Sequence, residues 1–360
     1  MNPRPLTVVL IVPTGVGASI GGFAGDALPV ARAIAQISDT LIAHPNVLNG
    51  AQLYWPIPNA LYVEGYALDK FAAGCWGLQP VHQNRIGLIL DSAMEPELQL
   101  RHLQAVDAAR ATLGLNVTDC ILTDRPLQVE LRMSESGASW GTIGNPDSLL
   151  RAADKLIAQA KVQAIAVVAR FPDDEGSQAL ENYRRGKGVD PLAGAEALIS
   201  HLVVRTFKIP CAHAPALLPL PLDPHLSPRS AAEEIGYTFL PCVLAGLSKA
   251  PQFTAHKAED RDQSVIAADR VDAVVIPATA CGGSAILSLS GRSTVQIIAV
   301  GDNKTQMQAS PEKLGIKALQ VNSYLEAIGV LVALRAGISP ASLGADISPL
   351  RCLSDSIKQI

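Results

Sequence analysis

The chain has 360 residues, of which 48% are hydrophobic and only 17% are charged, and its 29 basic residues stand against 33 acidic ones. The resulting net charge of −4 provides no positive field for nucleic acid or for an anionic membrane surface. No apolar run reaches the roughly 18 residues that a membrane-spanning helix needs, and the first apolar segment, Leu6–Val12, is too short for a signal peptide. We therefore expect a cytoplasmic protein with neither nucleic acid nor a membrane as partner.

The length and composition also bear on size and assembly. A chain of this length is expected to form two closely packed α/β lobes or one large unit. The low charge content favours a homo-oligomer, in which a second subunit covers part of the surface. The six cysteines include no CxxC pair, so we expect reduced thiols, no disulfide framework and no structural zinc. The sequence does not indicate which cofactor, if any, the protein binds.

Short β-branched runs alternate along the chain with alanine-rich helical segments. In chain order, the expected strands are Leu6–Val12, Arg85–Leu90, Val117–Thr123, Ala164–Ala169, Ala273–Ile276 and Val295–Val300. The expected helices are Glu97–Leu113, Asp147–Gln159, Pro191–Phe207 and Ser323–Ala336. This alternation predicts an α/β fold of mostly parallel sheets with covering helices.

The segment from Pro210 to Pro251 is rich in proline, which fixes φ and removes a backbone donor. We expect it to be an irregular but packed seam between two lobes. The predicted division is an N-terminal lobe at 1–208, which contains a glycine-rich loop, and a C-terminal lobe at 209–360.

The glycine-rich loop follows the first expected strand. Its glycines include Gly15, Gly17, Gly21 and Gly22, and a helix is expected near Leu28. Glycines let the backbone approach a ligand closely, and a helix N-terminus favours an anion. The spacing GxGxxxG departs from the dinucleotide fingerprint GxGxxG, and no acidic residue closes a second strand. Anion binding and simple packing remain two equal interpretations.

Next along the chain, a short buried strand leads directly into His44, Pro45 and Asn46. Ligands collect at the carboxyl ends of parallel strands. We therefore predict that His44 is an acid/base residue near neutral pH and that Asn46 binds substrate. The alternative is an ordinary structural histidine.

Two further loops combine polar groups with glycines. Ser134 and Ser136 precede a helix and suit either a polar ligand or a solvated turn. The long connection from Arg170 to Pro191 contains Arg184 and Arg185, which could clamp a phosphate or carboxylate. Its acidic cluster at 173–175 could hold a divalent cation, but we expect a solvated loop with balanced charges.

Two loops contain cysteine. Cys211 lies two residues from His213, and Cys281 follows a buried strand at a glycine turn. A thiol at a helix N-terminus has a lowered pKa, so Cys281 is the stronger candidate for a nucleophile or second base, although buried cysteine is more often a small apolar residue. The neighbouring Thr279, Gly282 and Gly283, with Asn303 after the next strand, are predicted to share the crevice.

Several long segments resemble a family of unknown function found chiefly in cyanobacteria and plant plastids. They are GVGASIGGFAGDALP, LIAHPNVLNG, IPCAHAPAL, SAAEEIGYTFLPCVLAGLSKAPQ and VVIPATACGGSAIL. The resemblance implies a cytoplasmic or stromal setting in a photosynthetic lineage, and it brings no activity with it. The Cys281 loop is also loosely similar to the second cysteine loop of cofactor-independent aspartate/glutamate racemases. The strand end that would supply their matching thiol has His44 and Asn46 instead.

These observations predict an enzyme that acts on a small anionic metabolite, carboxylated or phosphorylated, in a cleft at the carboxyl ends of the strands. The alternative is a non-catalytic metabolite sensor that uses the same loops. The enzyme hypothesis requires four distant segments, at 15–25, 44–49, 184–187 and 279–284, to converge.

Overall fold

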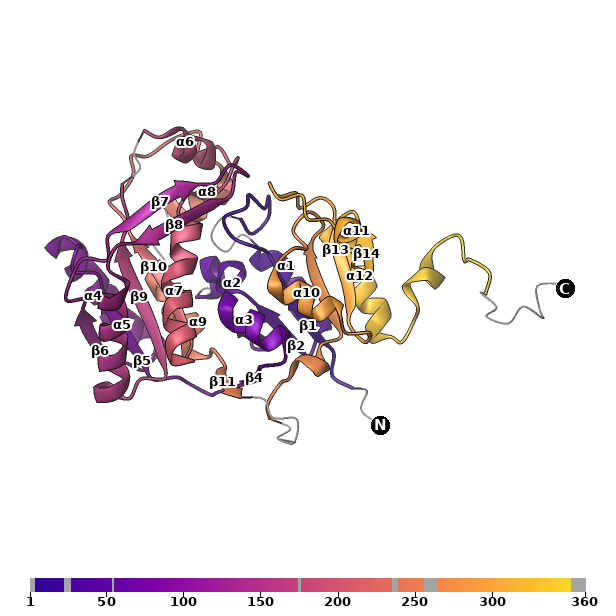
Figure 1. Ribbon diagram of the computed structural model, residues 1–360, viewed down its shortest axis with the longest axis horizontal. Coiled ribbons are helices and arrows are strands. Elements are labelled where there is room, and N and C mark those ends of the chain that lie inside the picture. The colour runs from indigo at the N-terminus through magenta and orange to yellow at the C-terminus, as the bar shows by residue number, and fades with distance from the viewer. Residues whose placement is uncertain are drawn as a thin grey trace.

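The computed structural model describes residues 4–22, 27–53, 55–173, 176–234, 239–255 and 264–350, and it contains two parallel sheets flanked by helices (Figure 1). The strands are β1 (Thr7–Leu10), β2 (Thr40–Ala43), β3 (Ala60–Tyr62), β4 (Trp76–Gln79), β5 (Ile86–Leu90), β6 (Val117–Leu122), β7 (Val129–Met133), β8 (Ser139–Ile143), β9 (Ala164–Arg170), β10 (Cys211–Ala216), β11 (Gln252–Ala255), β12 (Ala273–Pro277), β13 (Gln296–Val300) and β14 (Ala318–Val321). The helices are α1 (Leu28–Ile37), α2 (Pro45–Gln52), α3 (Gly65–Ala72), α4 (Pro96–Leu113), α5 (Pro146–Lys155), α6 (Gln178–Arg184), α7 (Ala193–Phe207), α8 (Pro228–Glu234), α9 (Phe239–Ser248), α10 (Ser284–Ser290), α11 (Pro311–Leu314) and α12 (Tyr324–Arg335), with short η1 (Leu156–Ala160), η2 (Ala268–Arg270) and η3 (Pro340–Leu343). The predicted α/β class is confirmed.

The larger sheet has six strands in the order β14-β13-β12-β1-β2-β3, and every pair is parallel. Val9 of β1 lies between Val274 of β12 and Ile42 of β2. Strands β2 and β3 lie on one side of β1, and β12, β13 and β14 lie on the other. This is the strand order of the doubly wound fold, in which ligands bind where the order reverses, outside the carboxyl ends of the strands. Here that point lies between β1 and β12.

The smaller sheet, β10-β9-β5-β6, is also parallel and is formed entirely by chain between β3 and β12. We call residues 84–250 the inserted lobe and residues 4–75 with 268–350 the terminal lobe. The two connections between the lobes pair as an antiparallel ribbon of β4 and β11. The division predicted at residue 208 does not follow the sheets, because β10 pairs with β9 and β12 returns to β1.

The sheets are buried because their strands are apolar on both faces. All four residues of β1 and all five of β5 and β12 are buried. Helices α1 and α12 cover one face of the larger sheet, and α3 and α10 cover the other. The core also crosses between the lobes, since α2 contacts α9 and α3 contacts α7, and Figure 1 places α2 and α3 between the two sheets.

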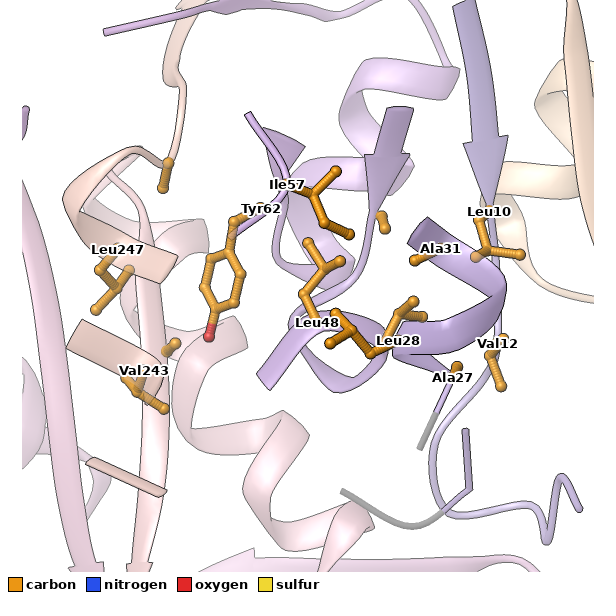
Figure 2. Close-up of a cluster of buried hydrophobic side chains, with 14 of the residues drawn as sticks. Leu10, Val12, Ala27, Leu28, Ala31, Leu48, Ile57, Tyr62, Val243 and Leu247 are labelled. Atoms are coloured by element: carbon orange, nitrogen blue, oxygen red, sulfur yellow. The ribbon is translucent and has the colours of Figure 1, made fainter. Parts of the chain in front are cut away.

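Tyr62 marks this crossing point. In Figure 2 its ring lies between Leu48 of α2 and Val243 and Leu247 of α9, and all four residues belong to one buried cluster. The tyrosine hydroxyl donates to Asn49 Oδ1 at 2.6 Å. The continuous apolar contact fixes the two lobes against each other at the base of the candidate site.

The proline-rich segment is more regular than predicted, although residues 217–227 lie in no helix or strand. It contains β10, α8 and α9. Strand β10 pairs only with β9, so Pro215 lies in an edge strand, where a missing donor is tolerated. In α9, Pro241 falls in the first turn, whose N–H groups have no partner within the helix.

Candidate functional site

The glycine-rich loop lies at the carboxyl end of β1 and is held between the two lobes. Gly15 and Gly17 have φ of 71° and 72°, values in the left-handed region. Ser139 of β8 donates its backbone N–H to the Gly15 carbonyl, and Gln306 donates to the carbonyl of Val16, both at 2.8 Å. The loop therefore joins the inserted lobe to the 303–306 segment. Gly25, which the sequence placed in the same loop, lies outside the described residues.

Packing alone requires glycine at these positions. A Cβ at any of the four would stand closer to a protein atom than ordinary van der Waals contact allows: Ser139 Oγ at Gly15, the Gly188 carbonyl at Gly17, Val12 at Gly21 and the Ala18 carbonyl at Gly22. The packing interpretation thus accounts for the glycines without a ligand, and their contact with an anion stays a prediction.

Two asparagines hold the loop in place. Asn303 is fully buried, accepts from the N–H of Ile20 at 2.8 Å and donates to the Ile20 carbonyl at 2.9 Å and to Tyr324. Asn46 donates from Nδ2 to the Gly21 carbonyl. Both predicted substrate-binding amides therefore bond to the loop. Asn46 also ties the loop to the strand end that carries His44.

His44 follows β2 directly, and Pro45 begins α2. Its Nδ1 accepts from the N–H of Asn46 at 3.2 Å, so Nε2 carries the hydrogen of the neutral ring. Burial, together with the nearby His201 and His213, lowers the pKa of His44 to about 3. Near neutral pH the imidazole is therefore uncharged, which disfavours the predicted acid/base role. His44 remains a neutral hydrogen-bond donor.

A second histidine of opposite character stands beside it. His201 of α7 forms an ion pair through Nδ1 with Oε1 of Glu64, a residue that follows β3 and is only 3% exposed. Burial by itself would lower the pKa of His201, but the hydrogen bond and charge of Glu64, with Asp69, outweigh it and raise that pKa. The other oxygen of Glu64 accepts from the N–H groups of Tyr66 and Ala67 and caps α3.

The two imidazoles meet over Gly65, the first residue of α3. A Cβ at Gly65 would lie 3.4 Å from His44 Nε2, 3.5 Å from His201 Nε2 and 3.0 Å from His201 Cε1. Because Gly65 has no side chain, both Nε2 atoms border the position that its Cβ would take.

Polar groups of the inserted lobe line the far side of this cluster. In His213 of β10, Nδ1 lies 3.2 Å from Ser200 Oγ, and Nε2 lies 3.7 Å from a carboxylate oxygen of Glu196. Glu196, Ser200 and His201 all belong to α7, and Glu196 and Ser200, four residues apart, lie on one side of that helix. The described residues include no set of three His, Cys, Asp or Glu side chains placed to hold a metal ion.

This arrangement suits proton transfer. When two titratable groups in one site have pKa values pushed in opposite directions, their acid and base roles are separated. A histidine oriented by a buried carboxylate through Nδ1 presents Nε2 as a base, as the third member of a catalytic triad orients its histidine. The neutral His44 presents an N–H to an oxygen that gains charge.

Cys281 does not belong to this site, and its predicted nucleophilic role is wrong. The residue is fully buried in the hydrophobic core, and its thiol lies near the Pro277 and Ala278 carbonyls. Burial, with the charge of Glu312, raises the pKa of Cys281 to about 11. The core position outweighs the effect of a nearby helix N-terminus. Five of the six cysteines are described, and all five are free thiols.

The other residues predicted near Cys281 lie on the opposite side of β1 from His44. The Thr279 hydroxyl contacts the Thr305 hydroxyl at 2.8 Å and accepts a hydrogen bond from the backbone N–H of Thr305. Gly282 packs against Ala309, and Gly283 precedes α10 with open space around it. Thr279 and Gly282 border the 303–309 segment, which also meets the glycine loop.

Arg184 and Arg185 bind protein carboxylates and therefore do not form the predicted anion clamp. Arg184 is buried and pairs with Glu234 at 3.0 Å, and it donates to the Pro221 carbonyl. Arg185 pairs with Asp223 at 2.6 Å and with Glu181. In the acidic cluster, Asp173 pairs with Arg170 at 2.5 Å, whereas residues 174 and 175 lie outside the described residues.

Ser134 and Ser136 lie at the tip of the β7–β8 hairpin. Their hydroxyls contact each other at 2.8 Å, and Ser134 also bonds to the Ala138 carbonyl and N–H. These bonds match the solvated-turn interpretation of this loop. The strand pairing of Met133 with Ser139 was not predicted.

Sequence reasoning missed Glu64, His201, His213 and Glu196 as site residues. Glu64 follows a strand of only three residues, Ala60–Tyr62, which is too short for a clear pattern. His201 and Glu196 lie within a predicted helix, where a polar residue gives no sign of which neighbour it meets. The usable signal was the presence of Glu196, Ser200 and His201 in a helix that is otherwise largely apolar.

Comparison with known proteins supports a family relationship but gives no activity. A family described as "Protein of unknown function (DUF3326)" matches residues 7–344. A curated relative from Synechococcus sp., described as an uncharacterized lipoprotein, is 59% identical over 359 residues, covering 100% of this chain and 99% of the relative. No solved structure matches the chain.

The expectation of a cytoplasmic protein is contradicted by this relative, which is described as a lipoprotein and matches over its full length. The sequence reasoning relied on the absence of a long apolar run, and a lipid anchor does not require one. Among the described residues, no helix has the length and apolar character needed to cross a bilayer.

Proposed function

The chain belongs to the DUF3326 family, and because the family description names no activity, we propose a function from the geometry between the lobes: an enzyme that moves a proton on a small anionic metabolite. The observation that carries the proposal is the pair of imidazoles over Gly65, whose pKa values are shifted in opposite directions. The reaction class that uses such a pair is proton abstraction next to a carbonyl or carboxylate group.

Each residue has one role in the proposed step. The C–H bond of the substrate breaks, its proton goes to His201 Nε2, and its electron pair forms an enolate. Glu64 stabilises the imidazolium that results, since it pairs with His201 Nδ1. The enolate oxygen accepts a hydrogen bond from His44 Nε2–H. Return of the proton to carbon completes the exchange, so no further reactant is needed.

The anionic group of the substrate would lie against the glycine-rich loop, through the amides of Gly15, Gly17, Gly21 and Gly22. Two features support this position. The loop follows β1 at the point where the strand order reverses, the usual ligand position in such sheets. Asn46 also links the loop to the end of β2, beside the proposed oxyanion donor.

Solvent isotope exchange tests the proposal. Small carboxylates and phosphate esters with a carbonyl group are incubated with the full-length protein in D₂O, and deuterium at carbon is followed by NMR. Native mass spectrometry of the purified protein identifies any metabolite that co-purifies, and such a metabolite is among the first compounds tested. We expect at least one compound to gain deuterium, and Glu64→Gln and His201→Gln to reduce the rate by about 100-fold or more.

The matched control is His82→Gln, because His82 is an exposed histidine that belongs to none of the contacts of the cluster. It is expected to leave exchange unchanged. A metabolite that binds tightly but gains no deuterium with the wild-type protein would contradict the enzyme and support the metabolite sensor. Equal loss of exchange in His82→Gln and His201→Gln would also remove the proposed base.

A further inference from the structure

A pocket of about 370 Å³ lies in the inserted lobe at the carboxyl ends of β9 and β10, away from the imidazole pair. Residues that follow these strands, among them Pro172 and Leu217, form its floor, and Leu98 and Ala105 of α4 form one wall. Leu192 and Leu240 lie opposite. The volume is that of a small-molecule site, and the lining is mostly aliphatic.

The charged side chains around this pocket are already paired within the protein. Arg101 pairs with Glu97 at 3.1 Å, Asp173 with Arg170 at 2.5 Å and Glu234 with Arg184 at 3.0 Å. Asp190 accepts from the N–H of Leu192 at 2.9 Å. A charged ligand would therefore have to displace a protein partner, and burying an uncompensated charge is costly. The pocket favours an uncharged ligand.

His102 gives the pocket one directional polar group. Its Nδ1 lies 2.7 Å from the Leu98 carbonyl. A carbonyl oxygen only accepts, so Nδ1 carries the hydrogen, and in the neutral ring Nε2 keeps a lone pair. Burial lowers the pKa of His102, which favours that neutral form. His102 lines the pocket, and among the described residues no hydrogen bond to its Nε2 is present. A ligand with one donor would satisfy it.

We propose that this pocket binds an uncharged, largely apolar small molecule with a single hydroxyl group, which lies among the aliphatic side chains and donates its hydrogen bond to His102 Nε2. The inference does not depend on the proposed proton transfer, since the two sites share no residue.

The first experiment compares 1-naphthol with 1-methoxynaphthalene, two probes of nearly equal shape of which only the first has a donor. Each is titrated by calorimetry into the full-length protein. We expect one saturable site and about fivefold tighter binding of 1-naphthol, the size of a typical net hydrogen bond. His102→Phe keeps a ring but removes the acceptor, so the two probes should then bind equally. His82→Phe is the matched control and should preserve the difference. Equal affinities in the wild-type protein would overturn the assigned hydroxyl.

The second experiment fills the pocket. Ala105→Trp places an indole among the lining residues and should weaken both probes about tenfold or more, whereas Ala108→Trp, on an exposed position of the same helix, should not. Amide hydrogen exchange provides a readout that does not depend on a variant, because bound 1-naphthol should slow exchange at Leu217 and Leu218. No saturable binding, equal effects of the two tryptophans, or protection confined to other segments would overturn the proposal.

Discussion

The carboxyl ends of the two parallel sheets have opposite chemistry. Beyond β2 and β3 of the larger sheet lie His44, Glu64 and the facing His201, ionisable groups that share a small space. Beyond β9 and β10 of the smaller sheet lies a mostly aliphatic pocket, whose neighbouring charges are each matched by a protein partner. Topology places both regions in the same way, and the residues that follow each strand decide what each region can bind.

The comparison also separates two uses of a buried ion pair. Arg184–Glu234 joins α6 to α8 beside the aliphatic pocket and leaves its charges satisfied. His201–Glu64 joins the two lobes and involves a histidine whose pKa is raised by its carboxylate partner. The first pair is expected to matter for stability and the second for proton transfer. Substitutions at each of these two regions are expected to separate their roles.

The largest effect is expected at His44 as a function of pH. The pKa of His44 in the folded protein, about 3, lies below the ordinary value of 6.5. At pH values between the two, His44 is protonated in the unfolded chain but neutral in the folded protein. The wild-type protein should lose up to about 4 kcal/mol of unfolding free energy as the pH falls through this window. His44→Asn, which keeps an acceptor for the Asn46 N–H, should lack that loss in urea titrations between pH 7 and pH 4.

The control for this measurement is His82→Asn, which removes an exposed histidine. Its stability should follow that of the wild-type protein at every pH. If the unfolding free energy of His44→Asn also changed with pH as that of the wild-type protein does, His44 would titrate normally and could not serve as a permanently neutral donor.

The next effect is expected at the ion pair beside the pocket. Glu234→Ala removes the carboxylate that pairs with the buried guanidinium of Arg184 and leaves its hydrogen bond to the Pro221 carbonyl. Loss of one member of a buried pair should lower the unfolding free energy by about 3 kcal/mol. Glu97→Ala breaks the exposed pair with Arg101 and should cost less than about 1 kcal/mol. Denaturant titration at pH 7 compares them, and similar losses in both variants would mean that Arg184 is not effectively buried.

The sequence predicted the sheets well because their strands are continuous apolar runs, such as Ala164–Arg170, whose pattern needs no knowledge of neighbours. It predicted His44 as a residue at a strand end. It could not predict that His201 would meet Glu64, because that contact joins the two lobes across 137 positions of chain, and no local pattern encodes it. Cys281 was misjudged for the same reason, since it is buried in a core cluster whose members come from segments far apart in the chain, α3 among them.

A smaller effect is expected when the space between the imidazoles is filled. Gly65→Ala adds a Cβ 3.4 Å from His44 Nε2 and only 3.0 Å from His201 Cε1, so the His201 ring must move by a few tenths of an ångström. We expect isotope exchange to fall about tenfold, which corresponds to about 1.4 kcal/mol of barrier. Stability should change by less than about 1 kcal/mol, because alanine favours a helix. Gly329→Ala, in α12 with open space around it, is the control and should leave exchange unchanged. Unchanged exchange in Gly65→Ala would place the reaction elsewhere.

The smallest effect is expected at His201, with the opposite sign to that at His44. Its folded pKa is raised above 6.5 by Glu64, so the charged pair stabilises the folded protein fully below pH 6.5 and loses that contribution as the pH rises through the folded pKa. Because the side chain is 39% exposed, solvent screening should keep the contribution below about 1 kcal/mol. His201→Gln should therefore be destabilised relative to the wild type mainly at low pH, whereas His44→Asn gains there. In the Glu64→Gln background the His201 effect should vanish, since its cause is the carboxylate. If the two histidine variants instead changed with pH in the same direction, one environment would govern both rings, and the division into a base and a neutral donor would fail.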